Sequence, residues 1–186
     1  MILGLDISTS CTGAALISNE GKLLHVTGIK PEGDDMFEKA VSFRIKLNAW
    51  LSTVKVSPRE ITSIYVEESL QGFRPGLSSA GTLLTLARFN GVASFISMLD
   101  LGIKPEYINV TTARKLVNLK IQRTLDTKQQ VLDWAVTNHS LAPTTRVVKS
   151  GKNKGESVIE SHYYDIADAI VVAMAGFEQR RGKIVD

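Results

Sequence analysis

Short apolar runs separated by turn residues fill much of the first 67 positions of the chain, a pattern typical of strands. The near-continuous apolar run at residues 2–8 predicts a buried strand, and a turn at 9–13 leads to a second strand over 14–18. Residues 19–22 have the chemistry of a hairpin turn, so we expect residues 23–29 to return antiparallel as a third strand. A fourth apolar run, at 61–67, predicts another strand.

Helical spacing appears after the third strand and again in the second half of the chain. Apolar residues three and four apart predict an amphipathic helix over 35–53: Ala40, Phe43, Leu47, Trp50 and Val54. The later pattern predicts helices over 80–99, 111–119, 127–137 and 161–177, with a short strand at 107–110. The polar, basic and glycine-containing segment 142–157 predicts a mobile loop.

Three antiparallel strands, a helix and then strand–helix–strand crossovers predict an α/β fold. We expect a five-stranded mixed sheet in the order 3-2-1-4-5, flanked by helices. The 186 residues contain no repeat or linker that would divide them, so we expect one domain over 1–186. This strand order would place the ends of the first and fourth strands side by side.

Four acidic residues stand where this fold could bring them together. Asp6 and Glu67 end the first and fourth strands, and Asp165 and Asp168 lie three apart, on one face of the last helix. Helix-start acids often only complement the helix dipole, but this helix is apolar nearly all round, where acids are seldom placed without partners. Carboxylates suit Mg²⁺ or Mn²⁺, and two such ions can clamp a phosphoryl transfer. The set therefore indicates a metal-dependent nuclease.

The net charge of +3 and the pI near 9.0 favour a polyanionic partner. One basic cluster holds Arg114, Lys115, Lys120, Arg123 and Lys128, and a second holds Arg146, Lys149, Lys152 and Lys154. Nucleic-acid contact and a solvated face are equally good interpretations of these two clusters. A third group, Arg180, Arg181 and Lys183, is expected to be a solvated face after the last helix.

The composition also restricts where the protein works. Cys11 is the single cysteine, so an internal disulfide is impossible, which suits a reducing cytoplasm. We expect it to be a small buried residue rather than a nucleophile. No secretory signal and no apolar run near 18 residues is evident, so we expect no membrane association.

The segment 4–13, an acid followed by a glycine-containing turn, fits both RNase H-like nucleases and sugar-kinase or actin-like ATPases. The ATPases need a second similar domain, and no second glycine–acid phosphate motif occurs here. The order and spacing of four short motifs is more specific: Leu3-Gly-Leu-Asp6 with Thr12-Gly13, Tyr65-Val-Glu67, Ala87-Arg88 with Gly91-Val-Ala93, and Asp165-Ile-Ala-Asp168-Ala169. Over residues 1–178 the chain resembles the RuvC-type Holliday-junction resolvases.

The resemblance implies an RNase H-like fold, a homodimer and magnesium-dependent, symmetric nicking of four-way DNA junctions that leaves 5′-phosphates. Asp6, Glu67, Asp165 and Asp168 would hold two Mg²⁺ ions, for which Mn²⁺ could substitute. Glu67 is preferred to its neighbour Glu68 because strand alternation turns Glu68 to the other face. Lys128 resembles the family's helix-start lysine near the DNA backbone and is counted with the catalytic residues.

The chain departs from the bacterial pattern in its loops, which indicates a phage or otherwise diverged resolvase in a bacterial or phage-infected cytoplasm. The loop after Glu67 is longer, and residues 146–154 have no bacterial counterpart. The predicted DNA contacts are Phe73, Arg74, Arg114, Lys115, Lys120, Arg123, Lys128, Lys149, Lys152 and Lys154. Phe73 could stack on an unpaired base or pack against the domain, and His162 could be a ligand, a proton carrier or a helix-start residue. The alternatives are a YqgF-like RNA-processing nuclease and a catalytically silent junction-binding protein.

Overall fold

The computed structural model describes residues 1–69 and 79–185 and confirms the predicted sheet. Five strands pair in the order β3-β2-β1-β4-β5. The strands are β1 (Ile2–Asp6), β2 (Thr12–Ile17), β3 (Leu23–Ile29), β4 (Ser63–Glu67) and β5 (Glu106–Ile108). The first three pair antiparallel, whereas β4 runs parallel to both β1 and β5. The carboxyl ends of β1 and β4 therefore lie next to each other.

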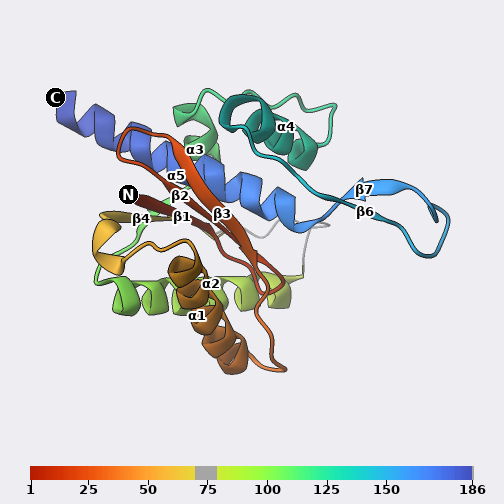
Figure 1. Cartoon of the computed structure of the whole chain (residues 1–186), viewed down its shortest axis with the longest axis horizontal. Helices are drawn as coiled ribbons and strands as arrows, with labels where there is room; N and C mark the ends of the chain where they lie inside the picture. Colours follow the sequence, from red (N-terminus) through yellow and green to blue (C-terminus); the bar gives the residue numbers. More distant parts are fainter. Residues whose placement is uncertain (70–78, 186) are drawn as a thin grey trace.

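Helices cover both faces of the sheet (Figure 1). One face carries α1 (Met36–Thr53) and α2 (Ala80–Leu101), and the other carries α5 (His162–Val185) with α3 (Val110–Leu116) and α4 (Thr127–His139) packed on it. A short 3₁₀ helix, η1 (Pro58–Glu60), leads into β4. The Asp35 side chain accepts hydrogen bonds from the backbone N–H groups of Phe37 and Glu38, which fixes the start of α1.

Strand alternation divides the core into two clusters. In β1, Leu3 and Leu5 pack with α1 and α2, whereas Ile2 packs under α5. In β4, Ile64 and Val66 face α1 and α2, and Tyr65 faces α5. Asp6 and Glu67 keep the same alternation, so both acids belong to the face that α5 covers.

The last helix is buried nearly all round because the sheet lies on one side of it and α3 and α4 on the other. Every residue from 166 to 175 is at most 5% exposed except Asp168. Glycines let this helix approach the strands closely. A Cβ added at Gly4 would lie 2.6 Å from the Ala173 Cβ, and one added at Gly176 would lie 2.1 Å from the Tyr65 ring.

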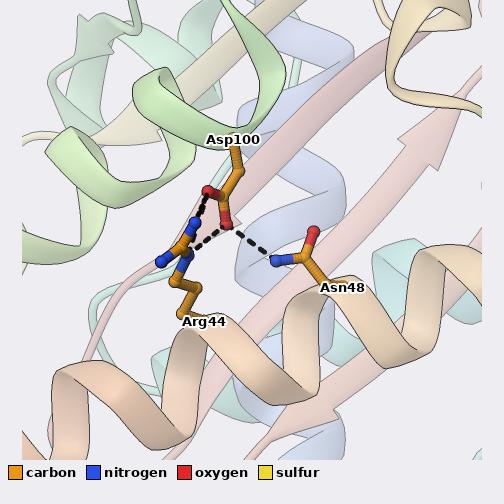
Figure 2. A network of polar contacts seen from close by, with 3 residues as sticks. All are labelled: Arg44, Asn48 and Asp100. Carbon is orange, nitrogen blue, oxygen red and sulfur yellow. Dashed lines mark hydrogen bonds and ion pairs between the residues drawn. The ribbon is translucent and has the colours of Figure 1, made fainter.

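On the opposite face, a small polar network joins α1 to α2 (Figure 2). The Arg44 guanidinium donates to both carboxylate oxygens of Asp100, with its Nη2 2.7 Å from Oδ1. The Asn48 amide donates to the same carboxylate at 2.7 Å. Because the Asp100 side chain is only 8% exposed, these donors replace the water that it loses on folding.

The structure corrects the expected loop at 142–157. Residues 145–159 form a two-stranded hairpin, with β6 (Thr145–Val147) antiparallel to β7 (Ser157–Ile159). Sequence reasoning missed it because each strand is three residues long and its hydrophobic pattern is weak. The last helix is also longer than predicted and includes Arg180, whose Nη1 lies 3.2 Å from the hydroxyls of Thr62 and Ser63. The expectation of a freely solvated group after the helix is therefore wrong for Arg180.

Among the described residues, one helix, α2, has the length and composition of a membrane span, and 28% of the window that qualifies is buried. A single such helix is weak evidence, because core helices pass the same test. The α2 residues Phe89, Ala93 and Leu101 pack in the core with α1 and the sheet. The expectation of no membrane association stays a prediction, as does that of a single domain.

Candidate active site

Asp6 and Glu67 meet at the carboxyl ends of two parallel strands. They follow directly after the paired residues Leu5 and Val66 of β1 and β4. Both side chains are half-buried. The backbone carbonyl of Glu67 accepts a hydrogen bond from the Asn90 side chain of α2 at 3.1 Å, which ties the end of β4 to the far layer. Two acids are thus fixed at one edge of the site by the sheet itself.

Asp165 and Asp168 reach the same place from the first turns of α5. Asp6 pairs with Gly13 across β1 and β2, and a Cβ added at Gly13 would lie 1.9 Å from the Asp165 carbonyl oxygen. Only glycine leaves room for this approach. Gly13 therefore sets the distance between the start of α5 and the strand that carries Asp6.

The four carboxyl groups interact electrostatically. Burial raises the pKa of Asp6 well above its usual range, and the charges of Glu67, Asp168 and Asp165 raise it further. Burial likewise raises the pKa of Glu67 to about 7, with a contribution from Asp168, and that of Asp168 to about 6. The pKa of Asp165 is also raised by burial. A cluster of this kind is costly to ionise unless a cation lies within it.

Two side chains from other helices supply positive charge to the cluster. The exposed Lys128, in the first turn of α4, lowers the pKa values of Asp6, Asp165 and Asp168. Arg114, from α3, places its Nη2 3.9 Å from Asp168 Oδ1 and lowers the pKa values of Glu67 and Asp168. Its Nε is buried and has no hydrogen-bond partner among the described residues. Arg114 therefore lies inside the site.

Cys11 and His162 line the side of the site next to Asp165. The Cys11 thiol is buried, and burial together with a hydrogen bond to Asp165 raises its pKa to about 12. The thiol is thus protonated at neutral pH, which disfavours a nucleophilic role. His162 is the first residue of α5, and it lowers the pKa of Asp165. A Cβ added at Gly28 would meet both Cys11 and His162, so β3 closes this side.

The donor set fits a hard divalent cation. It consists of carboxylate oxygens, whose pKa values are raised chiefly by burial and, for Asp6, Glu67 and Asp168, also by neighbouring carboxylates. In residues 1–69 and 79–185, no three His, Cys, Asp or Glu side chains already share one binding point. A cation bound by Asp168 would share that carboxylate with Arg114, whose Nη2 lies 3.9 Å from its Oδ1.

The remaining predicted DNA contacts are exposed on the surface or lie outside the described residues. Phe73 and Arg74 lie outside the described residues. The exposed basic side chains on α3 and the segment that joins it to α4 are Lys115, Lys120 and Arg123. Three more exposed lysines, Lys149, Lys152 and Lys154, lie at the tip of the β6–β7 hairpin. Their roles as DNA contacts stay predictions.

Sequence reasoning missed three features of the site. Arg114 was predicted only as a DNA contact because its run of basic residues gave no sign that one of them points inward. Lys30, which lowers the pKa of Asp165, stood alone in the sequence after a strand. Gly13 was assigned to a turn, whereas it lies inside β2. A glycine in a strand next to the strand that ends in Asp6 is a signal that could have indicated the close approach of a helix.

No protein-family model and no curated protein matches the chain. Solved structures do match its fold. The structure of Thermus thermophilus RuvC in complex with a Holliday junction substrate is 15% identical, with a TM-score of 0.61 over 97% of this chain and 95% of that one. A second structure of T. thermophilus RuvC is 17% identical, with a TM-score of 0.59 over 97% and 96%. The chain thus has a RuvC-like, RNase H-like fold.

Proposed function

We propose that this protein is a metal-dependent endonuclease that resolves four-way DNA junctions. The observation that carries the proposal is the approach of Asp6, Glu67, Asp165 and Asp168 to one another, from three separate segments, at the carboxyl ends of β1 and β4. The fold that produces this cluster is shared with RuvC, one structure of which contains a Holliday junction. A binder of polyanions without catalytic function would gain nothing from a half-buried acidic cluster.

In this proposal the four carboxylates hold two Mg²⁺ ions, for which Mn²⁺ can substitute. Bound cations of this kind supply activation of the attacking water and stabilisation of the leaving 3′ oxygen, which gives 5′-phosphate ends. Lys128 contacts the phosphate and neutralises the charge that develops on it. Arg114 offsets the charge on Asp168 and Glu67 while the phosphate is absent, and its unpaired Nε is free to donate once a phosphate oxygen enters.

Paired symmetric nicks need two active sites, which a twofold homodimer supplies. The layer of α1 and α2 offers a surface for it. Phe37, Val41 and Ile45 form an exposed stripe on α1, and Leu84, Phe95 and Leu99 form another on α2; all six are between 52% and 70% exposed. Apolar surface of this extent on one layer favours contact with a partner. A second copy of the chain is the partner that the chemistry of paired cutting requires.

The dimer proposal is tested by Leu99→Glu, measured by light scattering during size-exclusion chromatography. We expect the wild type to be a dimer, and the charge that Leu99→Glu places on the α2 stripe should shift the variant toward the monomer. Leu125→Glu makes the same change at a residue of similar exposure, 55% against 62%, outside that layer, and should leave the dimer intact. A wild-type monomer at micromolar concentration would refute the proposal.

The function itself is tested by incubating the purified protein with a synthetic four-way junction that has immobile arms, with Mg²⁺ and with EDTA, beside Asp6→Asn. Paired symmetric cuts that vanish with EDTA and in the variant support the proposal. Binding without cutting in any divalent metal would indicate a silent junction-binding protein. Cutting of RNA with the junction left intact would indicate a YqgF-like RNA-processing nuclease.

A further inference from the structure

The β6–β7 hairpin leaves the body of the molecule at the active-site end. Figure 1 shows it extending beyond the first residues of α5, away from the helical layers. Ile159 ends β7 only three residues before His162 begins α5, and Asp165 follows in the first turn of that helix. The root of the hairpin is therefore anchored beside the candidate active site, whereas its tip lies well away from it.

The hairpin contributes almost nothing to the core. Residues 144–157 are all exposed except the half-buried Val148, and even Val147 is 60% exposed. Backbone hydrogen bonds hold its shape: the Glu160 N–H donates to Thr144, and the Val148 N–H donates to Glu156 at 2.9 Å. A segment that costs conformational entropy to order and buries little apolar surface beyond Ile159 at its root needs another reason for its length.

The charge of the hairpin is one-sided. Arg146, Lys149, Lys152 and Lys154 stand against Glu156 alone between residues 144 and 157. Among residues 1–69 and 79–185, none of the salt bridges found involves these four cations. A loop that only connected two elements could consist of a few neutral polar residues. Unpaired cations on a narrow ribbon match a phosphate backbone.

We propose that the hairpin is an arm that grips the sugar–phosphate backbone of a DNA duplex next to the cut, and that it adds affinity without taking part in the chemistry. The proposal rests on the proposed junction-cutting function and specifies how one arm of the substrate is held. Seven residues separate Thr144 at the root from Gly151 at the tip, so the arm reaches on the order of 20 Å. Along B-form DNA that distance corresponds to about six base pairs.

Two variants separate the arm from the rest of the protein. In the first, residues 149–155 are replaced by Asn-Gly, a two-residue turn that can join Val148 to Glu156 and keep the hydrogen-bonded root. In the second, Lys149, Lys152 and Lys154 all become Gln. The control changes Lys22, Lys55 and Lys104 to Gln, which removes the same charge from exposed residues at the other end of the sheet. Circular dichroism and thermal unfolding confirm that each variant folds.

The experiment measures binding of a four-way DNA junction with Ca²⁺, as a function of salt, and single-turnover cutting with saturating protein and Mg²⁺. Both hairpin variants should weaken binding about tenfold or more near 0.1 M salt and lower the slope of log K against log salt by about 2 to 3. Their cutting rate at saturation should equal that of the wild type. Hydroxyl-radical footprinting should lose protection about six base pairs from the cut. The control variant should behave as the wild type does.

Hairpin variants that bind the DNA junction as the wild type does would overturn the proposal. A loss of the saturated cutting rate with unchanged binding would also overturn it, because the hairpin would then act in the chemistry. If the same variants lose affinity for duplex RNA but not for DNA, the partner assignment is wrong. If the wild type binds the junction through the hairpin but cuts nothing, the proposed nuclease function is refuted, whereas the proposed role of the hairpin in DNA binding is supported.

Discussion

Alternate residues of the same strands build the two faces of the sheet, and the two faces differ in what they bury. The face under α1 and α2 is closed by Leu3, Leu5, Ile64 and Val66, and a polar network around Asp100 joins the two helices that cover it. The face under α5 ends in carboxyl groups whose pKa values are raised by burial and by one another. Both faces bury apolar side chains, but the α5 face also brings acids together, which lowers stability when no cation is bound.

The sharpest test of the difference between the two faces uses two consecutive residues, Glu67 and Glu68. Glu67→Gln should lower junction cutting about 10³-fold, because it removes one of the four carboxylates that we propose as metal ligands. Glu68→Gln alters the residue just beyond the end of β4, which we expect strand alternation to turn to the other face, and should change cutting by less than about threefold. Single-turnover cutting with Mg²⁺ checks both. Equal losses in the two variants would contradict the assignment of the faces.

The next largest effect is expected from Gly13→Ala. The added methyl group meets the Asp165 backbone, so α5 must move away from the sheet. We expect a loss of about 1–3 kcal/mol in the free energy of unfolding and a fall in cutting greater than the fraction unfolded explains. Gly91→Ala is the matched control, since nothing lies within 4 Å of its added Cβ. It should stabilise α2 by up to about 1 kcal/mol, as urea unfolding can measure.

Arg114→Gln tests whether the guanidinium belongs to the acidic face. Without its charge, the pKa values of Glu67 and Asp168 should rise further, because Arg114 lowers both. The acid limb of the pH–rate profile should move to higher pH, and cutting near neutral pH should fall roughly 10–100-fold. Lys115→Gln removes the same charge from an exposed neighbour and should leave the acid limb in place. An unmoved acid limb in Arg114→Gln would contradict this role.

The ionisation of the acids under α5 should lower the free energy of unfolding as the pH rises. Because the pKa of Asp168 is raised to about 6 in the folded protein, the folded state binds more protons than the unfolded state between about pH 4 and 6. Without metal, the wild type should lose stability relative to Asp168→Asn as the pH rises from 4 to 7, by about 2 kcal/mol. Urea unfolding in EDTA at several pH values measures the difference. A difference that does not change with pH would refute the shift.

The smallest effect is expected on the other face. Arg44→Ala removes the guanidinium that contacts Asp100 but leaves the Asn48 contact in place. We expect a modest fall in the midpoint of thermal unfolding and no change in the cutting rate of the folded protein. A fall in cutting under conditions where the variant is fully folded would mean that the two faces are coupled more strongly than their packing suggests.

The sheet order could be predicted from the sequence because hairpin-turn residues and crossovers leave few ways to pair five strands. The meeting of Asp6 with Glu67 followed from that order, since both end parallel neighbours. The inward placement of Arg114 could not be predicted, because it depends on how α3 packs on α5. The hairpin was missed for a different reason: it is held by backbone hydrogen bonds, which leave little trace in the hydrophobic pattern.

We propose that the acids on the α5 face, and not acids elsewhere, cut a four-way junction. The most direct measurement compares cutting of one such junction by the wild type and by the amide variants of Asp6, Glu67, Asp165, Asp168 and Asp100. We expect paired cuts with Mg²⁺ from the wild type and from Asp100→Asn, and none from the other four variants. Cutting that survives in any of those four at the wild-type rate, or a wild type that leaves the junction intact, would contradict it.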